Sequence, residues 1–198
     1  QGVSSAASDV YKRQAIDGFT PTPRSHTPRG IYFHAMGNFF VTSDTHFSHA
    51  NILTFKATPT TMLRPGFRDV LDMNEQMVEN WNKVVRPQDH IWHLGDVAMK
   101  RDHLQIVKRL NGHKRLVMGN HDIFAVEEYL EAGFEKVMGM RVMDGLIMTH
   151  VPIHPDSLKR FKANIHGHTH SNHMMLHPNV RDPRYINLCV ENWNYTPV

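Results

Sequence analysis

Phe39-Phe40-Val41-Thr42-Ser43 is a short apolar run that leads directly into the polar triplet Asp44-Thr45-His46. The same arrangement occurs four more times along the chain, and each strand-like run again ends at a polar motif. The four later motifs are Gly95-Asp96, Gly119-Asn120, His150 and Gly167-His168. In open α/β sheets, ligands gather at the carboxyl ends of strands. We therefore expect five separate loops to converge on one functional site.

Segments with helical spacing alternate with the strand-like runs, which predicts an α/β fold. Residues 72–85 place Met73, Met77 and Trp81 on one helical face, and we expect Asp72 to be the N-cap of this helix. Further helices are expected over residues 101–110 and 123–132, the latter closed by Gly133. Strands are expected over residues 38–43, 90–94, 114–118, 164–166 and 185–190, together with a hairpin of 134–143 and 145–150 around Asp144-Gly145.

The length of 198 residues and the hydrophobic content of 40% suffice for one buried core, so we expect one domain. All apolar runs are too short to cross a bilayer, which argues against a membrane partner. The single cysteine, Cys189, excludes an internal disulfide and fits a reducing compartment, so a cytoplasmic location is expected. Because Cys189 lies in an apolar run, we expect it to be buried rather than nucleophilic.

The basic charge of the chain is concentrated in its first 35 residues. They hold four of the 22 basic and two of the 19 acidic side chains, which leaves 18 and 17, a formal charge of +1, in residues 36–198. This nearly neutral body does not argue for a groove that binds a polyanion. A nucleic acid is therefore an alternative partner that is not favoured.

Residues 1–35 are rich in Ser, Thr, Pro, Ala and Gly and lack a sustained period, so we expect a disordered leader. The stretch Asp9-Val10-Tyr11-Lys12-Arg13-Gln14 resembles the in-frame translation of a transposase adapter used in shotgun sequencing libraries. The leader is therefore expected not to be native, and Met36 is expected to be the natural start. The alternative is a genuine basic arm that binds a partner.

Seven side chains in or next to the loop motifs are potential metal ligands: Asp44, His46, Asp96, Asn120, His150, His168 and His170. Carboxylate, imidazole and amide donors together suit Mn, Fe, Zn or Ni, whereas an all-oxygen set would suit Mg or Ca. Seven ligands are too many for one tetrahedral zinc, but two ions roughly 3.5 to 4 Å apart that share one carboxylate would use them all. The sequence therefore predicts a binuclear transition-metal site. Gly95, Gly119 and Gly167 precede ligands, which predicts a close approach of backbone to the site.

The motifs resemble, complete and in order, the calcineurin-like metallophosphoesterase superfamily in its small stand-alone bacterial and phage form. The five blocks are Asp44-Thr45-His46, Gly95-Asp96, Gly119-Asn120-His121-Asp122, Thr149-His150 and Gly167-His168-Thr169-His170. The resemblance covers residue 36 almost to the end of the chain. It implies a four-layer α/β/β/α fold, in which a β-sandwich of two mixed sheets is flanked by helices. Relatives often continue into another helix, so the chain is compatible with truncation at its C-terminus.

The resemblance also implies the roles of the metal ligands. One ion would be held by Asp44, His46 and His170. The other would be held by Asn120, His150 and His168, with Asp96 as the bridge. The two divalent cations, with Mn favoured over Fe, Zn or Ni, would lower the pKa of a bridging water so that hydroxide attacks phosphorus in line.

Two further residues of the blocks are expected to act on the substrate. The resemblance implies that His121 faces the scissile phosphate and stabilises or protonates the leaving oxygen. It also implies that Asp122 orients the His121 ring through a hydrogen bond. The expected reaction is hydrolysis of a phosphomonoester or phosphodiester. Because the chain has no capping domain or long basic insertion, a small nucleotide or simple ester is favoured.

The alternatives from other classes are a non-catalytic scaffold of the same fold and a nucleic-acid binding module. The scaffold is disfavoured because every block is intact, including His121, which binding alone would not require. Outside the blocks, His93 and His166 are expected to be buried and hydrogen-bonded, whereas His49 and His154 stay open between structural and substrate-contacting roles. Five basic residues are expected to be solvated surface charges: Lys100, Arg101, Lys159, Arg160 and Lys162. Arg64 and Arg68 are candidates to line the mouth of the site.

Overall fold

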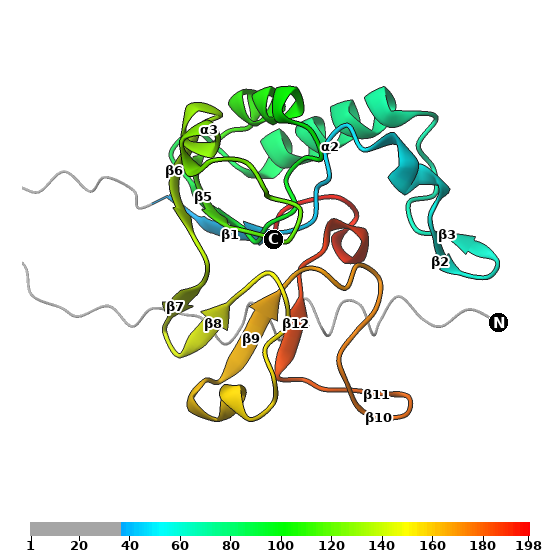
Figure 1. Cartoon of the computed structure of the whole chain (residues 1–198), viewed down its shortest axis with the longest axis vertical. Coiled ribbons are helices and arrows are strands. Elements are labelled where there is room, and N and C mark those ends of the chain that lie inside the picture. Colours follow the sequence, from blue (N-terminus) through cyan, green and yellow to red (C-terminus); the bar gives the residue numbers. More distant parts are fainter. Residues whose placement is uncertain (1–36) are drawn as a thin grey trace, which may run out of the picture. The chain divides into compact units, whose positions relative to one another are not determined.

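The computed structural model describes residues 37–198, which adopt a mixed α/β fold with two four-stranded sheets and two short two-stranded sheets (Figure 1). The expected leader over residues 1–35 and the expected start at Met36 lie outside the described residues. Within residues 37–198, every helix is too short or too polar to span a membrane.

The first sheet is entirely parallel, which corrects the expectation of two mixed sheets, and it has the strand order β1-β4-β5-β6. Its strands are β1 (Phe39–Thr42), β4 (His90–His93), β5 (His113–Val117) and β6 (Phe134–Met138). Parallel pairing brings the carboxyl ends of β1, β4 and β5 to one edge of the sheet, as the sequence predicts. The first three polar blocks follow directly from that edge.

Three helical segments cover one face of this sheet (Figure 1). They are α2 (Val70–Val84), the 3₁₀-helix η2 (Arg101–Arg109) and α3 (Val126–Glu131). Helix α2 packs Met73, Met77 and Trp81 into the core, at the helical spacing that the sequence predicts. The expected helix over 101–110 is thus of the tighter 3₁₀ type, and the one expected over 123–132 is shorter. Gly133 follows α3 with a φ of +112°, as expected for its end.

The predicted N-cap of helix α2 is wrong by one turn. The Asp69 carboxylate accepts the backbone N–H groups of Leu71 and Asp72 and is the true cap. Asp72 lies in the first turn, where its carboxylate accepts the backbone N–H of Arg68. Both aspartates satisfy free N–H groups at the start of the helix, and a pattern of apolar residues alone does not distinguish them.

The second sheet is mixed and has the strand order β12-β9-β8-β7. Its strands are β7 (Arg141–Met143), β8 (Leu146–Met148), β9 (Ala163–His166) and β12 (Tyr185–Asn187). The turn between β7 and β8 contains Asp144 and Gly145 at positive φ, which confirms the predicted hairpin turn. The strand expected over 134–143 is wrong, because it divides at Gly139-Met140 into β6 of the first sheet and β7 of the second. The strand expected over 185–190 ends at Asn187 and is followed by the 3₁₀-helix η4 (Val190–Trp193).

Backbone contacts join the two sheets close to the first polar block. Ser43 forms a parallel bridge with Cys189, and the Val190 N–H donates to the Ser43 carbonyl at 3.1 Å. Val41 and Val198 exchange two further hydrogen bonds, of 2.7 and 3.1 Å. The loops from both sheets therefore start from neighbouring positions.

Two short arms and two further 3₁₀-helices complete the described chain. The first arm consists of β2 (Lys56–Thr58) and β3 (Thr61–Met62) and follows the 3₁₀-helix η1 (Ala50–Thr54). The second arm consists of β10 (Met175–His177) and β11 (Val180–Arg181) and follows the fifth polar block. The 3₁₀-helix η3 (Ser157–Arg160) packs Leu158 against the smaller apolar cluster beside the second sheet.

Candidate metal centre

Loops from both sheets bring the predicted ligands together in two groups. Asp44, His46 and His170 form the deep group, in which one potential ligand atom from each residue lies within 4.8 Å of the others. Asp96, His150 and His168 form the outer group by the same measure. Asn120 joins the outer group because its Oδ1 lies 2.9 Å from His150 Nε2. All seven predicted ligands are therefore accounted for in two adjacent sets.

Asp96 lies between the two groups. Its Oδ2 is 3.5 Å from His46 Nε2 in the deep group and 3.4 Å from His150 Nε2 in the outer group. Donor atoms that share one cation at about 2.0–2.2 Å lie roughly 3.0–3.5 Å from each other, so both spacings suit shared coordination. The other oxygen, Oδ1, accepts the His121 backbone N–H at 2.9 Å. The fold thus fixes one oxygen of Asp96 and directs the second between the groups.

Several potential metal-binding atoms of the deep group are buried without a hydrogen-bond partner. They are Asp44 Oδ1 and both ring nitrogens of His46. Leaving a buried polar group unpaired costs about 1–3 kcal/mol, and a bound cation would remove that penalty for atoms that face it. Asp44 Oδ2, by contrast, accepts from Ser43 Oγ at 2.5 Å, the His168 N–H at 2.9 Å and Cys189 Sγ at 3.2 Å. The residues present therefore fit a metal site.

Hydrogen bonds orient two of the histidine rings. His150 Nδ1 lies 2.8 Å from the Leu94 carbonyl oxygen, and His170 Nδ1 lies 3.0 Å from Glu191 Oε1. A ring whose Nδ1–H donates to an oxygen presents Nε2 as a lone-pair donor, which is the usual arrangement of metal-binding histidines. With the Nδ1 proton donated in this way, Nε2 of each ring would be available to a cation.

A buried ion pair that the sequence analysis did not assign to the site supports the deep group. Arg64 is 2% exposed, and its Nε donates to Glu191 Oε1 at 2.8 Å. The same guanidinium donates to the carbonyl oxygens of Asp44 at 2.5 Å and Thr45 at 2.8 Å. The expectation that Arg64 lines the mouth of the site is therefore wrong, because the side chain lies behind the first ligand loop. Arg68, the other candidate, is exposed and pairs with Asp72.

The protonation states of three buried groups suit cation binding. Burial, with the Arg64 charge, lowers the pKa of His46 to about 2, so that its ring is neutral. Burial alone would raise the pKa of Asp96, but His150 and the backbone N–H of His121 outweigh it and hold the pKa at about 2. Burial likewise opposes ionisation of Glu191, but Arg64 and His170 hold its pKa at about 2. Neutral imidazoles and ionised carboxylates are the forms that bind metals. Burial opposes protonation of His150 and His170, but Asp96 and Glu191 respectively outweigh it and raise the pKa of these two rings, which would have to lose a proton to bind a cation.

Left-handed backbone conformations are concentrated at the ligands. Five of the seven have φ values between +47° and +67°: Asp44, His46, Asp96, His168 and His170. Such conformations cost of order 1–3 kcal/mol in residues with a side chain and are typical of functional sites. Gly167 allows two of these loops to touch, since a Cβ there would lie 2.3 Å from Asp44 Oδ2. The backbone at Gly167 thus lies close to the first ligand loop, and its approach to a metal or phosphate stays a prediction.

The predicted partnership of His121 and Asp122 is wrong. The His121 ring is exposed beside the deep group, with its centroid 5.7 Å from that of His46. Asp122 is buried, and its carboxylate accepts the backbone N–H groups of Asp96, Val97 and Gly119 at 2.7–3.0 Å. A turn from Gly119 to Asp122 directs the carboxylate beneath the loops instead of toward the His121 ring. Asp122 therefore holds the second and third ligand loops together.

The remaining predicted residues divide into buried and exposed groups. His93 and His166 are buried and hydrogen-bonded, as expected, through Thr45 Oγ1 and the Gly167 carbonyl oxygen. Cys189 is fully buried, also as expected. The His154 side chain is 74% exposed and lies beside Asp156, whereas His49 lies next to His46 with ring centroids 5.8 Å apart. The surface ion pairs Lys159–Asp156 and Arg101–Glu128 confirm the expectation of solvated charges at those two positions.

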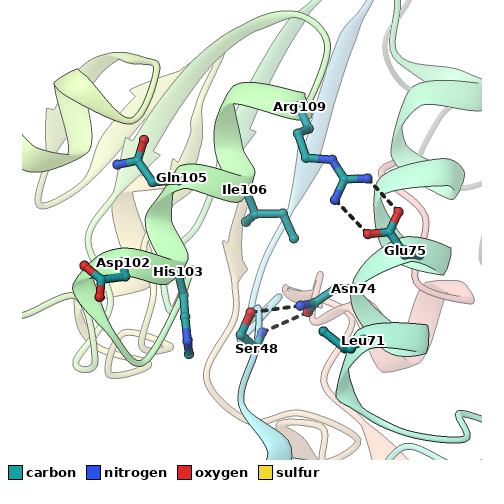
Figure 2. A pocket seen from close by; sticks show the side chains of 9 residues that line it. All are labelled: Ser48, Leu71, Asn74, Glu75, Asp102, His103, Gln105, Ile106 and Arg109. Carbon is teal, nitrogen blue, oxygen red and sulfur yellow. Dashed lines mark hydrogen bonds and ion pairs between the residues drawn. The ribbon is translucent and has the colours of Figure 1, made fainter.

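A separate open groove lies between η2 and α2, with a volume of about 330 Å³ (Figure 2). Ser48 and Asn74 are hydrogen-bonded to each other there, and the Arg109–Glu75 pair lies across one part of it (Figure 2). The seven predicted ligands do not line this groove. The groove therefore lies apart from the two ligand groups.

Comparisons with known proteins yield relatives whose names state no activity. No family model matches the sequence. The uncharacterized protein MJ1445 of Methanocaldococcus jannaschii is 33% identical over 169 residues, which are 83% of this chain and 88% of that protein. The Gene 66 protein of Mycobacterium phage D29 is 24% identical over 196 residues, with 80% of this chain and 90% of that protein covered. A crystal structure of the protein of unknown function AQ665 from Aquifex aeolicus matches with a TM-score of 0.56 and 27% identity, over 81% of this chain and 94% of that one.

Proposed function

The chain belongs to the same family as the uncharacterized protein MJ1445, and we propose that it is a phosphoester hydrolase with a binuclear metal centre. One observation carries the proposal: Asp96 Oδ2 lies within 3.5 Å of a histidine nitrogen from each ligand group. A carboxylate in that position suits two cations that share a ligand, as in enzymes that hydrolyse phosphoesters with a metal pair. The five ordered blocks that resemble the calcineurin-like metallophosphoesterase superfamily agree with it.

The proposal includes the finer features that the resemblance implies. The two four-stranded sheets would form the inner layers of a four-layer α/β/β/α sandwich, which the helices on one face of the first sheet support. A cytoplasmic location is proposed from the single, fully buried cysteine.

The two ligand groups would each hold one divalent cation, with Mn favoured over Fe, Zn or Ni because the donors mix nitrogen and oxygen. The deep group would bind through Asp44, His46 and His170, and the outer group through Asn120, His150 and His168. When bound, such a pair supplies an activated water near neutral pH and neutralises the charge of the phosphoryl oxygens.

The protein's own residues would position the ester and assist the departure of the leaving group. The exposed His121 ring lies beside His46, where it can reach a leaving oxygen and donate a proton to it. The backbone N–H of His121 also holds Asp96 in place. His121 thus presents its ring to the proposed substrate and holds Asp96 through its backbone.

Two variants test the proposal with bis-p-nitrophenyl phosphate and p-nitrophenyl phosphate as substrates in the presence of Mn. Asp96→Asn is expected to lose bound metal and activity together, because the shared carboxylate charge is gone. His121→Ala is expected to lower kcat with the metal content unchanged, by about 10²- to 10⁴-fold for an alkyl ester that needs a proton on its leaving oxygen and by less for the p-nitrophenyl esters, whose phenolate leaves without one. His154→Ala is the control, because the His154 ring is largely exposed.

The same assay separates the alternatives. Metal-loaded protein that hydrolyses no ester would favour a scaffold and refute the proposed activity. Salt-dependent DNA binding without cleavage would favour a nucleic-acid binding module. Full activity of His121→Ala on an alkyl ester would refute the role of that ring alone.

A further inference from the structure

A row of aromatic rings leads outward from the deep group. The His49 ring centroid lies 5.8 Å from that of His46 and 5.7 Å from that of Phe55. The Phe55 and His49 rings meet nearly at right angles, with an interplanar angle of 76°. Phe55 is 47% exposed, whereas its neighbours Leu53 and Leu63 pack against the core. An exposed aromatic surface is therefore separated from a predicted metal ligand by a single imidazole.

The position of Phe55 is fixed by contacts on both sides of the β2–β3 arm. The Phe55 carbonyl accepts the Leu63 N–H at 2.8 Å, which closes the base of the arm. The next residue, Arg64, donates to the carbonyl oxygens of Asp44 and Thr45. The arm is thus tied to the first ligand loop, which fixes the backbone of Phe55 relative to the predicted ligands. A backbone that is already ordered saves the entropy of fixing it when a ligand binds.

We propose that Phe55, with His49 beside it, is a subsite that stacks against a planar heteroaromatic substituent of the phosphoester, such as a nucleobase. The inference rests on the proposed function for the location of the phosphate. An exposed ring offers its face for stacking, which favours aromatic ligands over ligands that carry only a sugar or alkyl group. Ring-centroid spacings of 5.8 Å from His46 to His49 and 5.7 Å from His49 to Phe55 place Phe55 close enough to the deep group for the base of a nucleotide whose phosphate lies at the predicted ligands.

Two ligands that differ mainly in the base test the subsite. They are adenosine 5′-monophosphate and methyl ribofuranoside 5-phosphate, titrated into the full chain loaded with Mn. The measured quantity is Kd, or KM where the compound is hydrolysed. Wild-type protein is expected to bind the adenosine compound more tightly. Phe55→Ala is expected to weaken the binding of adenosine 5′-monophosphate roughly 5- to 140-fold and to leave the affinity for methyl ribofuranoside 5-phosphate unchanged.

Matched variants separate stacking from a general loss of structure. Phe39→Ala is the control, because Phe39 is 42% exposed and begins β1, whose other end leads into the ligand loop. It is expected to change neither affinity. Phe55→Trp is expected to keep or increase the preference for the base, since its ring also stacks.

The outcomes distinguish the subsite from the activity. Equal affinities for the two ligands in wild-type protein, or unchanged adenosine affinity in Phe55→Ala, would overturn the subsite even if esters are hydrolysed. Base-dependent affinity that is lost in Phe55→Ala supports the subsite even if no ester is hydrolysed, and the proposed activity then fails by itself.

Discussion

The two ligand groups differ in how the fold surrounds them. In the deep group, Asp44 and His46 are buried, and Arg64 with Glu191 supports them from behind. In the outer group, Asn120 and His168 are exposed to solvent. Asp96 and His150 of the outer group are buried as well, so the two groups differ chiefly at Asn120 and His168. If each group holds a cation as proposed, the outer group would exchange its cation more readily and admit substrate. We therefore expect a tightly held ion in the deep group and a weaker one in the outer group.

The largest expected effect comes from removing the support of the deep group. Arg64→Met would leave the Glu191 carboxylate buried without its guanidinium partner, which costs about 3–5 kcal/mol of folding free energy. Urea unfolding of metal-free protein measures this. The matched control is Arg109→Met, whose exposed pair with Glu75 is worth at most about 1 kcal/mol. Similar losses in both variants would contradict the distinction between supported and exposed sites.

The sequence predicted which polar residues come together better than it predicted the residues that hold them in place. All seven predicted ligands follow or lie next to strand-like runs, so the rule that strand ends converge predicted one common site, whereas their division into two groups was implied by the family resemblance. Arg64 and Glu191 lie 127 positions apart, and their pairing exists only through tertiary structure. Neither residue stands in a motif that would have marked it.

The wrong predictions likewise concern features that only the tertiary structure determines. The chain leaves the first sheet after Met138 and enters the second at Arg141, but residues 134–143 form one continuous pattern in the sequence. Asp122 follows His121 directly, yet its carboxylate meets the backbone of another loop. Local spacing shows which residues are near each other along the chain and does not show the direction of a side chain at a turn.

A smaller effect should separate the two ions from each other. Glu191→Gln keeps the shape of the side chain but removes the charge that faces both His170 Nδ1 and the Arg64 guanidinium, so urea unfolding first establishes that the variant is folded under the conditions of the titration. Loss of such a supporting contact typically weakens metal affinity about 10- to 100-fold, and only the deep ion should be affected. Calorimetric titration with Mn should then show the tighter phase shifted and the weaker phase unchanged. A uniform loss of both phases would contradict independent support, and Glu75→Gln is the exposed control.

The smallest expected effect concerns how the stability of metal-free protein depends on pH. One histidine of each group, His46 and His150, should change this dependence in opposite directions. The pKa of His46 is lowered to about 2, so below pH 6.5 the unfolded chain takes up a proton that the folded protein does not. As the pH is lowered below 6.5, this ring should decrease the free energy of unfolding by up to about 1.4 kcal/mol per pH unit. His46→Gln should therefore flatten the dependence of stability on pH.

His150 should act in the opposite direction. Burial opposes its protonation, but Asp96 and Asp44 outweigh it and raise the pKa of the ring. The folded protein therefore gains stability from a protonated His150 at low pH and loses it as pH rises through the raised pKa. His150→Gln should make the loss of stability on acidification steeper, whereas His46→Gln makes it shallower. Urea unfolding in EDTA between pH 7 and 5 measures both slopes. If the two variants changed the slope in the same direction, the two groups would not differ in how the fold sets their charge.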